Sequence, residues 1–480
     1  MPNPFRPSYL IFAIAVQTLH FFTNAAGQDI EARIQISVKA PSVYVRGRFA
    51  NGERRNLSFL RSYAGFGGLG ERIGHVALQN ANGESVAFQS AVPGEYVSDA
   101  PFTRWSYSVD LSPRKEQNAA AHVSWISKDA GILMLGDLLP LVDRIPISAK
   151  LVVFDDWDQS QGEVAGVIVT KDAYSTVIPR GKDLKFRKVH SGDTPITTRY
   201  FGQWLFTEDE LAEFSQKIYV QHRLNFTSDV TDEVFVNMLK FPEQINPGQW
   251  QAETRGRNVT IISSDMPFRS QSLQRLHEQL RHEMFHLWIP NGVNLSGNYD
   301  WFYEGFALYA SLKMAVAMNQ IRFVDFLDTL TRAQAIDARQ TNRLSLIDAS
   351  NKRWAGADTY IYARGMVTAF LCDVLFLHHS KGKRSVNDIF REFYAKHKYP
   401  NSRTDGNMAA LALLESNKEL IPVIDRYIKG PDKIAWEAEL LLAGLEAKNG
   451  LTVASKLSGK QKDLLDALGY NNWRKLSKQK

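Results

Sequence analysis

The chain has 480 residues, of which 44% are hydrophobic and 22% charged, as in a globular protein. This length predicts two or three domains, because one hydrophobic core rarely organises more than about 250–300 residues. The formal net charge of +6 is spread along the chain. Without a basic stripe or a recognition motif, that charge argues against nucleic-acid binding.

The first 27 residues have the features of a secretory signal peptide. Arg6 precedes an apolar run from Tyr9 to Phe22, and the small residues of TNAAGQ follow it. A basic residue, a short apolar region and small residues define such signals. The run is short for a membrane span of about 20 residues, and an uncleaved anchor is the lesser alternative. We therefore expect export to the periplasm or the extracellular space, cleavage after Ala26 or Gly27, and no stable membrane span thereafter.

Cys372 is the single cysteine and lies within the apolar run MVTAFLCDVLFL. No intramolecular disulfide can form, so the fold must depend on its hydrophobic cores despite the predicted export. We expect Cys372 to be a small buried hydrophobe rather than a nucleophile.

Residues 28–198 are predicted to form an all-β N-terminal domain. ARIQISVKA places Ile34, Ile36 and Val38 at alternate positions, which is typical of a strand with one buried face. KLVVFDDW and EVAGVIVT are short β-branched runs separated by the turn-like DQSQG. Gly-rich GFGGLG is expected to be a loop, and it lacks the Gly-Lys-Ser/Thr ending of a phosphate-binding loop.

The pattern changes near Phe206, and we predict that a mixed domain, which becomes helical, begins at residue 199. Thr207, followed three residues later by Glu210, is a capping box that predicts a helix start. Strand-like EVFVNMLKF and VTIISS come next, and helices are expected from Ser270 onward. The predicted class is α+β, with this domain over residues 199–430 and a helical tail over residues 431–480.

The strongest chemical signal is the HExxH sequence formed by His282, Glu283 and His286. On a helix the two histidines lie one turn apart on the same face, so both imidazoles can bind one zinc ion. Glu283 sits beside that face, where it can take a proton from a metal-activated water. The neighbouring His277 has the same His-Glu pair, but Arg281 stands where its second ligand would be.

Catalytic zinc needs a third protein ligand and an open position. Glu304 lies 18 positions beyond His286, among Trp301, Phe302 and Phe306. These apolar neighbours argue against an exposed carboxylate, and a buried carboxylate is costly unless it is paired or binds a metal. Two helices joined by a short loop would bring Glu304 back to the ion. We expect Asp300 to cap the second of these helices.

These residues resemble the gluzincin metallopeptidases, which pair HExxH with a downstream glutamate ligand. Glu304-Gly305 in WFYEGFALYAS is similar to the family's aromatic-x-x-Glu-Gly helix. Residues 190–446 resemble the glycyl aminopeptidase family, and more distantly the aminopeptidase N and leukotriene A4 hydrolase family. The resemblance implies a thermolysin-like catalytic domain that follows the β domain, with one zinc ion. The common C-terminal PDZ domain is not expected.

The same resemblance implies two further site residues. Tyr362-Ala363-Arg364-Gly365 is similar to the family's Tyr-x-Lys-Gly element, whose tyrosine supports the oxyanion, although Arg364 replaces the lysine. Glu253 stands ahead of VTIISS, about where such enzymes hold the substrate amine, but the flanking glycines differ. A salt-bridge role in a loop is the alternative for Glu253.

Three functions are consistent with these residues. The leading hypothesis is an exported zinc aminopeptidase, in which His282, His286 and Glu304 bind the metal. Glu283 would act as general base, and Tyr362 would stabilise the oxyanion of a peptide substrate. The second is a zinc endopeptidase with no free-amine requirement. The third is a catalytically silent peptide-binding protein of the same fold.

Overall fold

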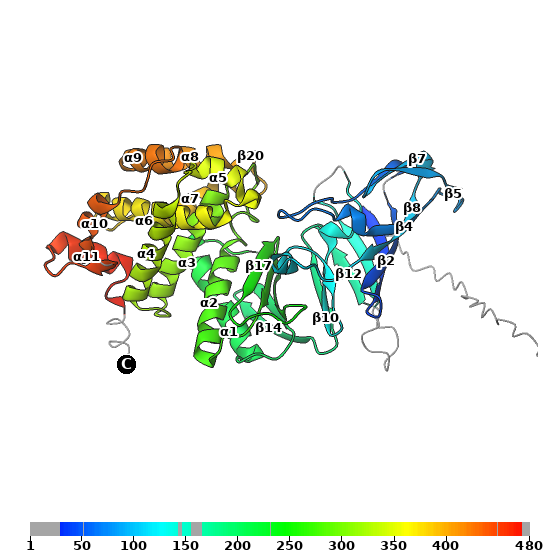
Figure 1. Cartoon of the computed structure of the whole chain (residues 1–480), viewed down its shortest axis with the longest axis horizontal. Helices are drawn as coiled ribbons and strands as arrows, with labels where there is room; N and C mark the ends of the chain where they lie inside the picture. Colours follow the sequence, from blue (N-terminus) through cyan, green and yellow to red (C-terminus); the bar gives the residue numbers. More distant parts are fainter. Residues whose placement is uncertain are drawn as a thin grey trace, which may run out of the picture.

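The computed structural model describes residues 29–50, 52–142, 146–154, 166–230, 232–448 and 450–472. The predicted signal peptide, residues 1–27, lies outside these residues. Figure 1 shows β-sheets at one end of the molecule and helices at the other, with a further sheet between them. The predicted α+β class, with an all-β N-terminal region before a mixed-to-helical one, is confirmed.

A seven-stranded sheet forms the main layer of the N-terminal half, in the order β12-β11-β1-β2-β8-β4-β5. Ile34 and Ile36 are buried as predicted, while Val38 is half-buried just beyond the end of β1. The strands are β1 (Ile30–Ser37), β2 (Ser42–Phe49), β4 (Ile73–Gln79), β5 (Ser85–Val86), β8 (Arg104–Asp110), β11 (Ala149–Phe154) and β12 (Gly166–Thr170). The runs predicted as strands, KLVVFDDW and EVAGVIVT, overlap β11 and β12.

Two three-stranded sheets complete this half, in the orders β3-β7-β6 and β13-β10-β9. Their strands are β3 (Arg54–Ser58), β6 (Phe88–Val92), β7 (Glu95–Phe102), β9 (Trp125–Ile126), β10 (Ala130–Met134) and β13 (Val177–Gly181). The Gly-rich segment predicted as a loop runs from β3 toward β4 and contains only a short 3-10 turn, Gly70–Arg72.

A five-stranded sheet, in the order β14-β15-β16-β18-β17, lies between the two ends. Its strands are β14 (Lys185–Ser191), β15 (Thr194–Tyr200), β16 (Val234–Lys240), β17 (Trp250–Arg255) and β18 (Asn258–Ser263). β15, β16 and β18 run parallel, and β17 is the antiparallel edge strand. The division predicted between residues 198 and 199 falls inside β15, and the sheet pairs residues from both sides of it.

Helices pack on this sheet and form the C-terminal part of the chain (Figure 1). They are α1 (Glu208–Phe226), α2 (Arg269–Phe285), α3 (Ala307–Ala317), α4 (Phe323–Arg339), α5 (Leu346–Asn351), α6 (Asp358–His379), α7 (Val386–His397), α8 (Gly406–Glu415), α9 (Ile421–Val423), α10 (Glu437–Ala443) and α11 (Gly459–Leu468). The capping box predicted for α1 is confirmed. Thr207 Oγ1 accepts from the Glu210 N–H at 3.2 Å, and Glu210 Oε2 accepts from the Thr207 N–H at 2.9 Å.

Helix α6 is the central element of the larger core. It is the one helix among the described residues that is long and apolar enough to cross a membrane, but 89% of its apolar window is buried inside the protein. Its hydrophobicity is therefore explained by packing against α3, α4 and α10. Cys372 is fully buried on this helix, as predicted, and burial raises the pKa of its thiol, which keeps the sulfur protonated.

Candidate active site

The HExxH histidines lie at the C-terminal end of α2. Residues 271–288 contain no proline or glycine, and α2 runs without a break to Phe285, with His286 as its C-cap, ahead of Pro290. His282 and His286 therefore share one face, and their rings are 4.8 Å apart. Both histidines are buried, together with Glu283 between them.

Glu304 comes from a π-helical segment, Trp301–Phe306, that leads directly into α3. Such turns recur at functional sites, since they shift a side chain out of the ordinary helical register. The prediction that Asp300 caps this helix through its side chain is wrong, because Asp300 has helical backbone angles and makes no cap hydrogen bond. Its carboxylate instead accepts from the Tyr303 hydroxyl at 2.7 Å and from Arg353 at 2.8 Å.

Two glycines bring Glu304 next to Tyr362. A Cβ built on Gly305 would stand 2.6 Å from the Cα of Gly365, so the π-helical segment and α6 cross with their backbones in contact. Gly365 lies three residues beyond Tyr362, on the same face of α6. The glycines of the Glu-Gly and Tyr-x-x-Gly motifs thus explain why these two side chains meet.

Replacing Gly365 with alanine is expected to destabilise the chain by about 1–3 kcal/mol, the usual cost of overpacking. The new Cβ would stand 2.7 Å from Gly305 Cα and 3.2 Å from the Trp301 carbonyl oxygen, so the backbone that carries Glu304 would have to move. Thermal unfolding and zinc titration measure the two effects. Gly459→Ala is the control, because its Cβ would meet nothing within 4 Å. Unchanged zinc affinity would contradict this role for the crossing.

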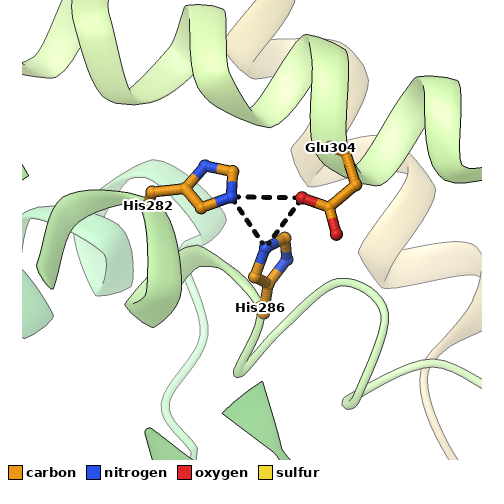
Figure 2. Close-up of side chains that lie close together, drawn as sticks. All are labelled: His282, His286 and Glu304. Carbon is orange, nitrogen blue, oxygen red and sulfur yellow. Dashed lines mark hydrogen bonds and ion pairs between the residues drawn. The ribbon is translucent and has the colours of Figure 1, made fainter. Parts of the chain in front are cut away.

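The three predicted metal ligands lie together (Figure 2). Nε2 of His282 is 3.3 Å from Nε2 of His286, and Oε2 of Glu304 is 3.1 and 3.4 Å from these two nitrogens. Ligand atoms placed about 2.0–2.1 Å from a tetrahedral zinc ion are separated by about 3.3 Å. The triangle therefore has the size of one face of a zinc coordination shell.

The position of the proton on His286 and the negative charge nearby both favour the binding of a cation. His286 Nδ1 lies 3.1 Å from the carbonyl oxygen of Ile289, which favours a proton on Nδ1 and a free lone pair on Nε2. Asp300, Glu304 and Asp358 all pair with Arg353, so the carboxylates around this guanidinium outnumber it. The excess of negative charge favours a cation.

Glu304 is held as a carboxylate. Burial alone would raise its pKa, but the charge of Arg353, with smaller contributions from the two histidines, outweighs it, so the pKa lies well below its usual value. An ionised oxygen is what a metal ligand requires.

Glu283 is positioned by a residue that the sequence did not single out. Its Oε2 lies 2.9 Å from the Thr254 hydroxyl, which comes from the edge strand β17. Burial raises the pKa of Glu283, although the two histidines act in the opposite direction. A raised pKa is favourable for a carboxyl group that must take up a proton and release it again.

Tyr362 stays a hydrogen-bond donor in this environment. Its hydroxyl lies 2.8 Å from Glu304 Oε2 and 3.1 Å from Arg353 Nη2. Burial, followed by the charge of Glu304, raises the pKa of the phenol well above 10. A protonated phenol beside the metal ligands can donate to a developing negative charge.

Glu253 lies on β17, the residue before Thr254, and not in a loop. Its carboxylate accepts from the Tyr63 hydroxyl, lies 3.2 Å from His122 Nδ1 and pairs with Arg255 at 2.9 Å. Burial would raise its pKa, but Arg255 and His122 lower it to about 2. Tyr63 and His122 belong to the N-terminal half, and no local sequence signal could have indicated them.

Glu253, Glu283, His286, Glu304 and Tyr362 line one cavity of about 1390 Å³ between the two halves of the chain, and His282 is buried behind this lining. The N-terminal half contributes residues that include Arg54, Tyr63 and His122, and the C-terminal half contributes the metal ligands His286 and Glu304. The cavity is large enough for a short peptide, because drug-sized ligands occupy about 300–1,000 Å³.

Solved structures share this fold, although no protein-family model and no curated protein matches the sequence. An aminopeptidase N family protein from Idiomarina loihiensis matches with a TM-score of 0.74 and 13% identity, over 90% of this chain and 82% of that chain. The M1 zinc metallopeptidase from Deinococcus radiodurans matches with a TM-score of 0.54 and 14% identity, over 85% and 96% of the two chains. The fold is therefore that of the M1 zinc metallopeptidases, which are gluzincins. The closer likeness to glycyl aminopeptidases stays a prediction.

Proposed function

We propose that this chain is an exported zinc metallopeptidase, and most specifically an aminopeptidase. The observation that carries the proposal is the buried triangle of His282, His286 and Glu304, with Glu283 and Tyr362 beside it in a cavity of peptide size. The two structures above support the class. A mutant of the Deinococcus radiodurans enzyme has been solved with a bound Tyr-Ser-Ala substrate, at 14% identity and a TM-score of 0.55 to this chain.

The residues divide the chemistry among them. Zinc, when bound, supplies Lewis acidity that activates a water and polarises the scissile carbonyl. Glu283 takes the water's proton at its carboxylate, which Thr254 holds in place, and returns it to the leaving amine. Tyr362 donates its phenol proton in a hydrogen bond to the oxyanion of the tetrahedral intermediate.

The edge strand β17 is suited to hold the substrate backbone. The strand-like run VTIISS overlaps β18, which lies inside the sheet, whereas β17 is the edge. Residues 252–255 of β17 line the cavity. An extended peptide that adds to this edge would place its amino end near Glu253.

If Glu253 binds the amino end, a free amine must be essential. An aminoacyl reporter is then expected to be cleaved roughly 30-fold or more faster than its N-acetylated form, since losing one partner of a buried charge pair costs about 2 kcal/mol or more. Glu253→Gln should bring the two rates together. Glu233→Gln, a carboxylate that does not line the cavity, should leave their ratio unchanged. The kcat/KM of both reporters is the measurement.

The endopeptidase alternative is favoured by one observation. Tyr63, Arg255 and His122 already partner Glu253, so a substrate ammonium would have to compete with three resident groups. Equal cleavage of the free and acetylated reporters would support this alternative and exclude the aminopeptidase assignment.

Export remains a proposal that the N-terminal residues support. Fractionation of a producing cell, with mass determination of the mature chain, tests it. A mature chain that begins near Gln28 and lies outside the inner membrane is the expected result. An intact N-terminus in the cytosol would contradict it.

A further inference from the structure

Arg353 makes contacts that neither the motifs nor the proposed mechanism account for. It lies in a short 3-10 turn, Arg353–Ala355, just before α6, and its side chain is only 11% exposed. Nη1 donates to Glu304 Oε1 at 2.9 Å and to Asp300 Oδ1 at 2.8 Å. Nη2 donates to the Tyr362 hydroxyl at 3.1 Å, and Nε donates to Asp358 Oδ1 at 3.0 Å.

These contacts hold Glu304 in a single orientation. A carboxylate can rotate, and it can bind a metal through one oxygen or through both. Here Arg353 occupies Oε1, while Oε2 faces His282 and His286. The guanidinium thus selects one oxygen for the metal, and its planar fork is rigid enough to keep that choice.

The same guanidinium fixes the orientation of Tyr362. Because Nη2 donates to the phenol oxygen, the phenol proton must point away from Arg353; it faces Glu304 Oε2 here and is free to turn to a substrate oxyanion. Asp300 and Asp358 in turn hold Arg353 from two sides. Arg353 therefore connects residues from the π-helical segment and from α6 into one hydrogen-bonded unit.

We propose that Arg353 is a positioning residue that fixes Glu304 and Tyr362 together, and thereby sets both the metal affinity and the turnover rate. The metal part depends only on the triangle of ligands, whereas the turnover part rests on the proposed peptidase function. The residue is distinct from the ligands, because in this structure its guanidinium touches the carboxylate oxygen that faces away from the histidines.

The first measurement is zinc affinity, determined by competition with a chromophoric chelator. Arg353→Gln is expected to bind zinc about 10- to 100-fold more weakly, the usual effect of losing a partner that orients a ligand. Arg353→Lys keeps the positive charge but loses the planar guanidinium. Its zinc affinity should lie between that of Arg353→Gln and that of the native chain. Arg384→Gln is the matched control, since Arg384 also bonds neighbouring side chains but lies outside the cavity.

The second measurement is kcat and KM at saturating zinc on a short aminoacyl reporter. Arg353→Gln should lower kcat and leave KM nearly unchanged, because the residue acts through Tyr362 and Glu304. The loss should be smaller when Tyr362 is already phenylalanine, as expected for coupled residues. A changed KM with unchanged kcat would overturn the positioning role in favour of direct substrate contact.

Zinc affinity that equals the native value in Arg353→Gln, with unchanged thermal unfolding, would also overturn the proposal. If Arg353→Gln unfolds, Asp358→Asn provides the second variant, because it frees only the Nε edge of the guanidinium and should weaken zinc binding to a smaller extent. If the native chain hydrolyses no peptide, the proposed function fails, and the zinc titration still decides the metal part.

Discussion

Replacing Glu283 with glutamine is expected to lower kcat by about 10²–10⁴-fold, the range in which general acid–base groups contribute. Glutamine keeps the shape and can still bond the Thr254 hydroxyl, but it cannot take a proton. The zinc content should stay the same, because the proposed ligands are His282, His286 and Glu304. Metal analysis together with cleavage of a mixed peptide library measures both quantities.

The chain supplies its own control for this experiment. Glu278 follows His277 on the same helix, α2, but its side chain is 47% exposed and lies outside the cavity. Glu278→Gln should leave kcat unchanged. If native chain and Glu283→Gln variant were both inactive on the whole library while zinc was bound, the silent peptide-binding alternative would replace the enzyme.

The metal triangle could be foreseen because two of its three members are fixed by local geometry. Once residues 271–285 are helical, the HExxH spacing places His282 and His286 on one face without reference to any other part of the chain. Glu304 required the additional argument that a carboxylate among Trp301, Phe302 and Phe306 must find a partner. Helix periodicity and the cost of burying a carboxylate predict contacts within one helix or between it and the next helix, but not beyond.

The rest of the site depends on contacts between residues far apart in the sequence. Thr254 reaches Glu283 because β17 is a sheet edge, and Tyr63 reaches Glu253 because the two halves of the chain dock together. Neither pairing leaves a pattern of hydrophobic or charged residues that a sequence could reveal. Asp300 shows the same limit, since its sequence position suits a cap but Arg353 and Tyr303 bind its carboxylate instead.

Local sequence patterns also could not predict which sheet each strand joins. Alternating residues predict that a strand forms and which face is buried, as for Ile34 and Ile36 in β1. They do not predict that β14 and β15 pair with β16 rather than with the N-terminal sheets. For this reason the domain boundary predicted at residue 199 lies inside β15, which belongs to the sheet of the C-terminal domain.

Replacing Arg364 with leucine is expected to reduce the free energy of unfolding of the C-terminal part by about 3–5 kcal/mol, the cost of breaking a buried ion pair. Arg364 on α6 and Asp337 on α4 are both fully buried and lie 2.7 Å apart. Three carbonyl oxygens, those of Tyr427, Gly430 and Asp432, accept the remaining donors of the guanidinium at 2.9–3.1 Å. Leucine would leave the carboxylate without its charged partner and these carbonyls without the guanidinium donors.

The four acceptors around Arg364 also explain why this chain has arginine at the position where the Tyr-x-Lys-Gly element of the gluzincins has lysine. They surround a planar fork, and a single ammonium on a flexible stem cannot bond them all. Arg364→Lys should therefore be destabilised as well, but less than Arg364→Leu. The double variant Arg364→Leu/Asp337→Leu should recover much of the loss, because removing both charges leaves no buried carboxylate unpaired. Hydrogen exchange over residues 424–434, with thermal unfolding, measures the effect, and full protection of that segment in Arg364→Leu would show that other contacts hold it.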